Sequence, residues 1–109
     1  RMLNQAAAAI LVCGDLDRAF PPAPDFWVID AAIAAQNMTL AANDLGIGSV
    51  WLGTWPDEKR VKRQATIFQL PETIVPHSIL ALGYPAEDID MRAVRPSRYE
   101  ENRVHVNQW

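Results

Sequence analysis

The chain has little cysteine, no excess of positive charge and no long hydrophobic run. Its single cysteine, Cys13, excludes an internal disulfide and fits a reducing compartment, so we expect a cytoplasmic protein. A formal net charge of −3, with no dominant basic face, argues against a nucleic-acid partner. No stretch reaches the roughly 18 apolar residues of a membrane span, so we expect no membrane partner.

The 109 residues allow one domain, which we take to cover residues 1–109, and half of them are hydrophobic, as in a globular protein. Arg1 precedes Met2, which indicates that the chain begins inside a longer reading frame. The apolar run over residues 6–13 resembles part of a signal peptide, but it ends in Gly14-Asp15. A strand buried on both faces is the better interpretation of that run.

Residues 25–54 organise the chain. They predict a long helix that has Asp25 as its N-cap and ends at Gly46, a residue free to adopt the left-handed conformation. This helix is apolar on almost every face, apart from a seam in which Asp30, Asn37 and Asp44 recur every seven residues. Such a helix belongs inside a protein and requires cover on several sides.

The remaining pattern predicts strands over residues 6–14, 48–52 and 74–82, the last as a central strand that begins after Pro76. A second helix starts with Pro56 at its first position and runs to about residue 69. We expect Val61, Ala65 and Phe68 on its inner face. Its basic residues, Lys59, Arg60, Lys62 and Arg63, are expected on a solvated outer face.

Alternating strands and helices predict a mixed three-layer arrangement. A domain this small covers only part of its own surface, so the apolar helix needs more cover than the chain provides. A second copy, another chain or a missing segment must supply that cover. From residue 86 onward the chain is charged, and we expect this tail to lie along a surface or reach a partner chain.

A candidate binding segment follows the strand over residues 48–52. It consists of Trp51, Leu52, Gly53 and Thr54, at a strand end before a helix, where α/β folds often hold ligands. Gly53 lacks a side chain, so the backbone there can approach a flat ligand closely. A packed tryptophan followed by a turn glycine explains the pattern equally well.

Arginines recur every third residue in the tail, at positions 92, 95 and 98. On an extended segment this spacing can gather guanidinium groups on one side and hold a phosphate. A solvated tail is the commoner explanation of the spacing. His77 is expected to be a hydrogen-bonded core histidine, and no cysteine or carboxylate stands at metal-ligand spacing from His105. Any chemistry would therefore be carried by a cofactor.

Six segments in this order resemble the C-terminal half of the nitroreductase family of FMN-dependent oxidoreductases. They are AILVCGD from Ala9, Asp30 with Ala35-Gln36-Asn37, LGIGSVWLG from Leu45, Leu70-Pro71 with Ile74-Val75-Pro76, LGYP from Leu82, and the ending Arg98-Tyr99 with Val104-His105 and Trp109.

The resemblance implies an α+β fold, with a sheet flanked by helices, and an intertwined homodimer that binds FMN at the subunit interface. It implies electron transfer from NADH or NADPH through the flavin to a small-molecule acceptor such as a nitroaromatic or a quinone. Backbone N–H groups of the segment from Trp51 to Thr54 would bind the reactive edge of the flavin. Arg98, and less directly Arg95, would meet the FMN phosphate.

The N-terminal half of that family is absent from this sequence. A fragment of a flavoenzyme, a chain completed by a separate chain, a flavin carrier and a non-catalytic assembly module that remains from such an enzyme are the open alternatives.

Overall fold

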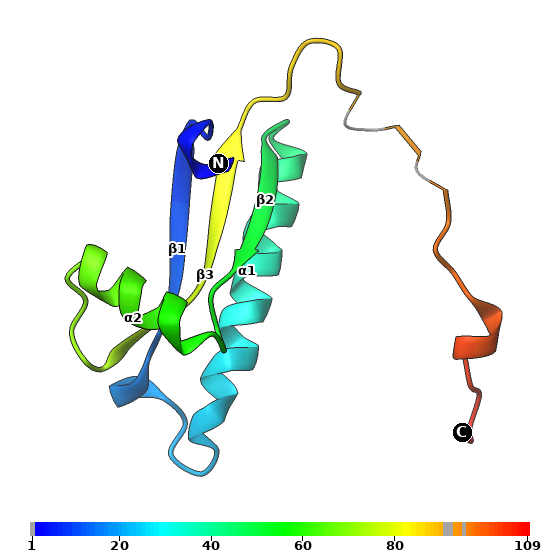
Figure 1. The fold of residues 1–109 in the computed structure, drawn as a ribbon. Coiled ribbons are helices and arrows are strands. Elements are labelled where there is room, and N and C mark those ends of the chain that lie inside the picture. The colour runs from blue at the N-terminus through cyan, green and yellow to red at the C-terminus, as the bar shows by residue number, and fades with distance from the viewer. Residues whose placement is uncertain (1, 91–92, 95) are drawn as a thin grey trace.

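A computed structural model describes residues 2–90, 93–94 and 96–109. Three antiparallel strands, β1 (Ala8–Asp15), β2 (Gly48–Gly53) and β3 (Ile74–Gly83), form a sheet in the order β1-β3-β2 (Figure 1). The sequence is therefore right about the central strand, although β3 begins two residues before Pro76 and includes it. The fold is of the predicted α+β class.

Two α-helices lie on opposite faces of the sheet. The long helix α1 (Trp27–Asp44) contacts all three strands, and the shorter α2 (Glu58–Ile67) contacts β3 (Figure 1). Leu80 of β3 packs with α1, whereas its neighbour Ile79 lines a groove with α2, as the alternation of side chains along a strand requires. Short 3-10 helices complete the described part of the chain: Met2–Asn4 (η1), Leu16–Arg18 (η2), Pro24–Phe26 (η3) and Glu101–Arg103 (η4).

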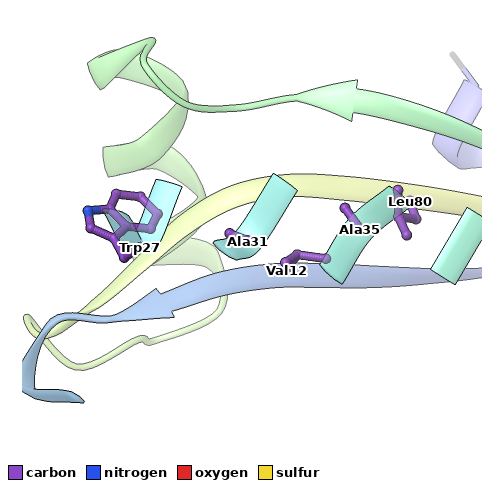
Figure 2. Close-up of a cluster of buried hydrophobic side chains, with 5 residues drawn as sticks. All are labelled: Val12, Trp27, Ala31, Ala35 and Leu80. Atoms are coloured by element: carbon purple, nitrogen blue, oxygen red, sulfur yellow. The ribbon is translucent and has the colours of Figure 1, made fainter. Parts of the chain in front are cut away.

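The hydrophobic core is small and lies between α1 and the sheet. It consists of Val12, Trp27, Ala31, Ala35 and Leu80, with the helix side chains directed at the strands (Figure 2). Ala35 and Leu80 are completely buried. The alanines let the helix backbone approach the strands closely, which explains how a single helix spans the sheet.

The start of each helix differs from the prediction. Asp25 is not the N-cap of α1, because Pro24 opens the 3-10 helix η3 and Asp25 already lies inside it. Pro56 is not the first residue of α2, because Asp57 takes the N-cap position and accepts hydrogen bonds from the backbone N–H groups of Lys59 and Arg60.

The C-terminal end of α1 agrees with the prediction, whereas that of α2 differs from it. Gly46 follows α1 with φ of +71°, the left-handed conformation expected of it. Phe68, expected on the inner face of α2, is half exposed because the helix ends at Ile67 and Phe68 is its C-cap.

Much of the apolar surface remains open. The solvent-accessible area is 9196 Å², whereas a compact protein of 12.2 kDa exposes about 6,100 Å². The radius of gyration is 17.1 Å, compared with about 13 Å for a compact chain of this length. The two values agree with the prediction that the chain does not cover itself.

Two parts of the structure account for this openness. The strand β1 is buried on one face only, at Val12 and Gly14, and not on both faces as expected. The C-terminal tail leaves the end of β3 and first borders the start of β2, but its part from residue 96 onward runs apart from the sheet (Figure 1). None of the helices in the described ranges is long and apolar enough to cross a membrane.

The contact between Gly14 and Trp27 gives a test of the core. A Cβ atom added at Gly14 would overlap the Trp27 ring, whereas one added at Gly53 would meet nothing within 4 Å. We expect Gly14→Ala to lower the free energy of unfolding by about 1–3 kcal/mol through overpacking. Urea denaturation of Gly14→Ala and of the control Gly53→Ala measures the free energy of unfolding of each. Equal stability of Gly14→Ala and Gly53→Ala would contradict the packing described here.

Candidate functional site

The predicted binding segment, residues 51–54, lies where β2 leaves the sheet. Its side chains alternate between open and buried surroundings: Trp51 is 37% exposed and Gly53 is exposed, whereas Thr54 is only 1% exposed. The strand belongs to the edge of the sheet, so β3 pairs with one side of it. The opposite side of its backbone is the side available to a ligand.

The hydrogen-bond pattern shows which backbone groups of β2 point to that open side. Thr54 N donates to the carbonyl of His77 in β3, at 3.2 Å. In an antiparallel pair, backbone groups alternate between the partner strand and the opposite direction. The N–H and C=O groups of Gly53 and Trp51 therefore point away from β3. The guanidinium of Arg60, on α2, donates a hydrogen bond to the Gly53 carbonyl, which agrees with the outward direction of that carbonyl.

The space beside Gly53 is open. An added Cβ atom would meet nothing within 4 Å, and no positive φ requires glycine at this position. Gly53 is therefore not explained by packing or by backbone conformation within this chain. An outward N–H group with free space beside it suits a planar ring system that carries hydrogen-bond acceptors on its edge.

A β-bulge in the central strand sets the end of β2. Along β1, Val12 pairs with Ser78 and the next residue, Cys13, pairs with Pro76, so His77 is the additional residue. The His77 carbonyl accepts hydrogen bonds from Thr54 N at 3.2 Å and from Trp55 N at 3.0 Å. These bonds turn the chain out of the strand immediately after Gly53.

Aromatic side chains surround the His77 imidazole. The ring centroids of Trp27 and Trp51 lie 6.1 and 6.0 Å from that of His77, in edge-to-face arrangements. Trp55 contacts Trp27 in the same manner, with centroids 5.1 Å apart. The His77 ring Nδ1 is 3.2 Å from the Ser78 hydroxyl, so the prediction of a hydrogen-bonded core histidine is confirmed.

Helix α2 also contributes to the segment, which the sequence did not reveal. Arg60 Nη1 donates to the Gly53 carbonyl at 2.9 Å. Its side chain is 63% exposed, as expected for a solvated face, but the contact with Gly53 was not predicted. The Gln64 amide nitrogen lies 2.8 Å from the Thr54 hydroxyl. The i, i+4 spacing of Arg60 and Gln64 places both side chains on one face of α2. Only the turn at residues 54–57 brings that face to the binding segment, and the spacing alone does not predict this turn.

The two tail arginines are separate from this segment. Arg95, like Arg92, lies outside the described residues. Arg98 is exposed, and the part of the tail from residue 96 onward runs apart from β2 (Figure 1). Within the part of the chain that the structure describes, Arg98 is therefore not brought to the 51–54 segment. The described residues also contain no cluster of His, Cys, Asp or Glu suited to a metal ion.

Comparison with known proteins identifies the family. The sequence pattern of the nitroreductase family matches residues 1–84, which include all three strands and both α-helices. The chain belongs to the nitroreductase family. The open backbone edge at Gly53 therefore belongs to a member of a family of oxidoreductases.

Individual relatives agree with this assignment. A protein of Methanothermobacter thermautotrophicus, named provisionally as an NADH dehydrogenase/NAD(P)H nitroreductase, is 41% identical over 108 residues, which are 99% of this chain and 53% of that protein. A crystal structure of a Bacteroides thetaiotaomicron protein with the same provisional name superposes with a TM-score of 0.80 and 38% identity, over 96% of this chain and 57% of the other.

A third match carries a cofactor in its name. The FMN-dependent nitroreductase of Clostridium difficile superposes with a TM-score of 0.77 and 28% identity, over 95% of this nitroreductase-family chain and 59% of the other. The chain spans between half and three fifths of the length of these three matches.

Burial of His77 predicts a pH dependence of stability. Desolvation lowers the pKa of His77 below its ordinary value of 6.5, so the unfolded chain binds this proton more readily than the folded chain. The stabilising contribution of neutral His77 is complete above about pH 6.5 and is lost as the pH falls toward the lowered pKa.

Denaturation of the unmodified chain and of His77→Phe between about pH 7 and pH 5 measures this contribution. We expect stability to decline with falling pH more steeply in the unmodified chain than in the variant. Parallel pH profiles would show that His77 does not titrate in this manner.

Proposed function

We propose that the protein containing this chain is an FMN-dependent oxidoreductase that passes electrons from NAD(P)H to a nitroaromatic, a quinone or a similar small-molecule acceptor. Membership of the nitroreductase family and the name of the Clostridium difficile neighbour support this proposal. The observation that carries it is the outward backbone of Gly53, with open space where a side chain would stand.

The residues of this chain would bind and orient the flavin. Bound there, FMN would supply the two-electron redox chemistry that links NAD(P)H to the acceptor. The outward N–H groups of Gly53 and Trp51 are the donors that this chain offers to the polar edge of the ring, within the segment from Trp51 through Leu52 and Gly53 to Thr54. Such donors stabilise charge on the ring and so tune its electron affinity.

We propose Arg98, and secondarily Arg95, as ligands of the FMN phosphate. A guanidinium group can bind two phosphate oxygens at once, which suits this role. Arg98 is exposed in a tail that has little contact with the sheet, so it is free to join a site when the assembly is complete.

We propose that the outer face of α1 is covered by a second copy of the chain. Ile29, Ile33 and Leu40 are 54%, 55% and 60% exposed, and they share one stripe of the helix with Gln36. An exposed apolar stripe of this kind marks an interaction surface. The family resemblance favours a homodimer over a complementary chain as the source of this cover.

We further propose that residues 1–109 form the C-terminal portion of one nitroreductase-like domain. The open face of β1, the exposed stripe of α1 and the span of about half the length of the matched proteins support this view. A cytoplasmic location accords with a chain whose one cysteine, Cys13, forms no disulfide.

Flavin binding is the first test. We expect the purified chain to be yellow, or to quench FMN fluorescence on titration. Gly53→Val should leave the stability within about 0.5 kcal/mol, because the space beside Gly53 is open and an added Cβ atom meets nothing within 4 Å. It should weaken FMN binding by about tenfold or more, since an obstructed contact of about 1.4 kcal/mol is a factor of ten.

The smaller Gly53→Ala serves as a graded control and should weaken binding less than Gly53→Val. Oxidation of NADH or NADPH in the presence of a quinone then separates an enzyme from a flavin carrier. A folded, assembled chain that stays colourless and ignores added FMN would contradict the proposal.

Assembly through α1 is the second test. We expect Ile33→Glu to reduce the mass measured by sedimentation equilibrium from dimer to monomer, because a buried unpaired carboxylate is costly. Ile67→Glu is a matched control on α2, where the isoleucine is 60% exposed on the opposite face of the sheet. A chain that stays dimeric in both variants would place the interface elsewhere.

A further inference from the structure

The peptide unit that joins Gly53 to Thr54 is held at both of its polar ends. Its carbonyl accepts from Arg60 Nη1 at 2.9 Å, and its N–H donates to the carbonyl of His77 at 3.2 Å. Because a peptide unit is planar, two hydrogen bonds at opposite ends fix its orientation. Arg60 supplies the bond on the outer side of β2, where no strand does so.

This restraint matters because it falls on a glycine. As a glycine, Gly53 has more conformational freedom than a residue with a side chain, and its N–H group is the one that we assign to the flavin. Fixing the peptide plane after Gly53 limits the φ and ψ angles that the glycine can adopt. Leu52, paired with Ile79 of β3, holds the peptide unit before Gly53, so the glycine N–H is restrained from both sides.

Arg60 is itself oriented by its own helix. Asp57 Oδ2 lies 3.1 Å from Arg60 Nε, while Asp57 Oδ1 caps the first turn of α2. One turn further along, Gln64 holds the side chain of Thr54, the residue after Gly53. The two contacts, at i and i+4 on one face of α2, tie the helix to consecutive residues of the binding segment.

We propose that Arg60 is a positioning residue for the flavin contact of Gly53. It acts through the Gly53 carbonyl and need not touch the flavin. This inference rests on the proposed function and adds to it a role for α2, whose basic residues are otherwise a solvated surface. The ion pair between Arg60 and Asp57 is mostly exposed, so it adds little to the free energy of unfolding. Its effect is to orient the Arg60 guanidinium.

Two variants with the same change of charge separate positioning from general electrostatics. Arg60→Gln removes the guanidinium from Gly53, while Arg63→Gln removes one from the same helix at a position without this contact. We expect Arg60→Gln to weaken FMN binding by about threefold to tenfold, the range for loss of a charged hydrogen bond at an exposed site. Arg63→Gln should bind FMN as the unmodified chain does, and Arg60→Lys should recover part of the loss.

Amide hydrogen exchange of Thr54, measured without flavin, provides an independent readout. We expect Thr54 N–H to exchange faster in Arg60→Gln than in Arg63→Gln, because its peptide unit has lost one restraint. Equal FMN affinity and equal exchange in the two variants would overturn the role of Arg60. If the unmodified chain binds no FMN, the proposed function fails instead, whatever the exchange of Thr54 shows.

Discussion

The carbonyl of His77 is the point on which the geometry of the candidate site depends. It lies in a bulge of the central strand and accepts the N–H groups of Thr54 and Trp55, which ends the pairing of β2. This bond fixes the alternation of backbone groups along β2 and so directs the N–H of Gly53 outward. The bulge also brings the His77 ring against Trp27 and Trp51, so the same feature joins the site to the core.

The second constraint is the shortage of cover. The helices and strands of the described residues leave much of the apolar surface uncovered, and the exposed area is about half as large again as that of a compact protein. The outer stripe of α1 and the detached tail are both exposed for this reason. The structure thus leaves apolar surface open, and the candidate binding segment stands at the edge strand of the sheet.

How much the sequence could predict follows from the range of the interactions involved. The long helix, its glycine stop at Gly46 and the central strand depend on local pattern, and these predictions were right. The Asp25 cap failed because Pro24 started a 3-10 helix one residue earlier. The contact of Arg60 with Gly53 was missed because it depends on the direction of a turn, which no periodicity encodes.

The central claim is that Gly53 presents its N–H group to a flavin. The most direct measurement is the amide NMR resonance of Gly53 during titration with FMN. The account predicts a large shift of that resonance and slower exchange of its proton, together with changes at Trp51 and smaller ones at strand β1. An unchanged Gly53 resonance in a sample that demonstrably binds FMN would contradict the account.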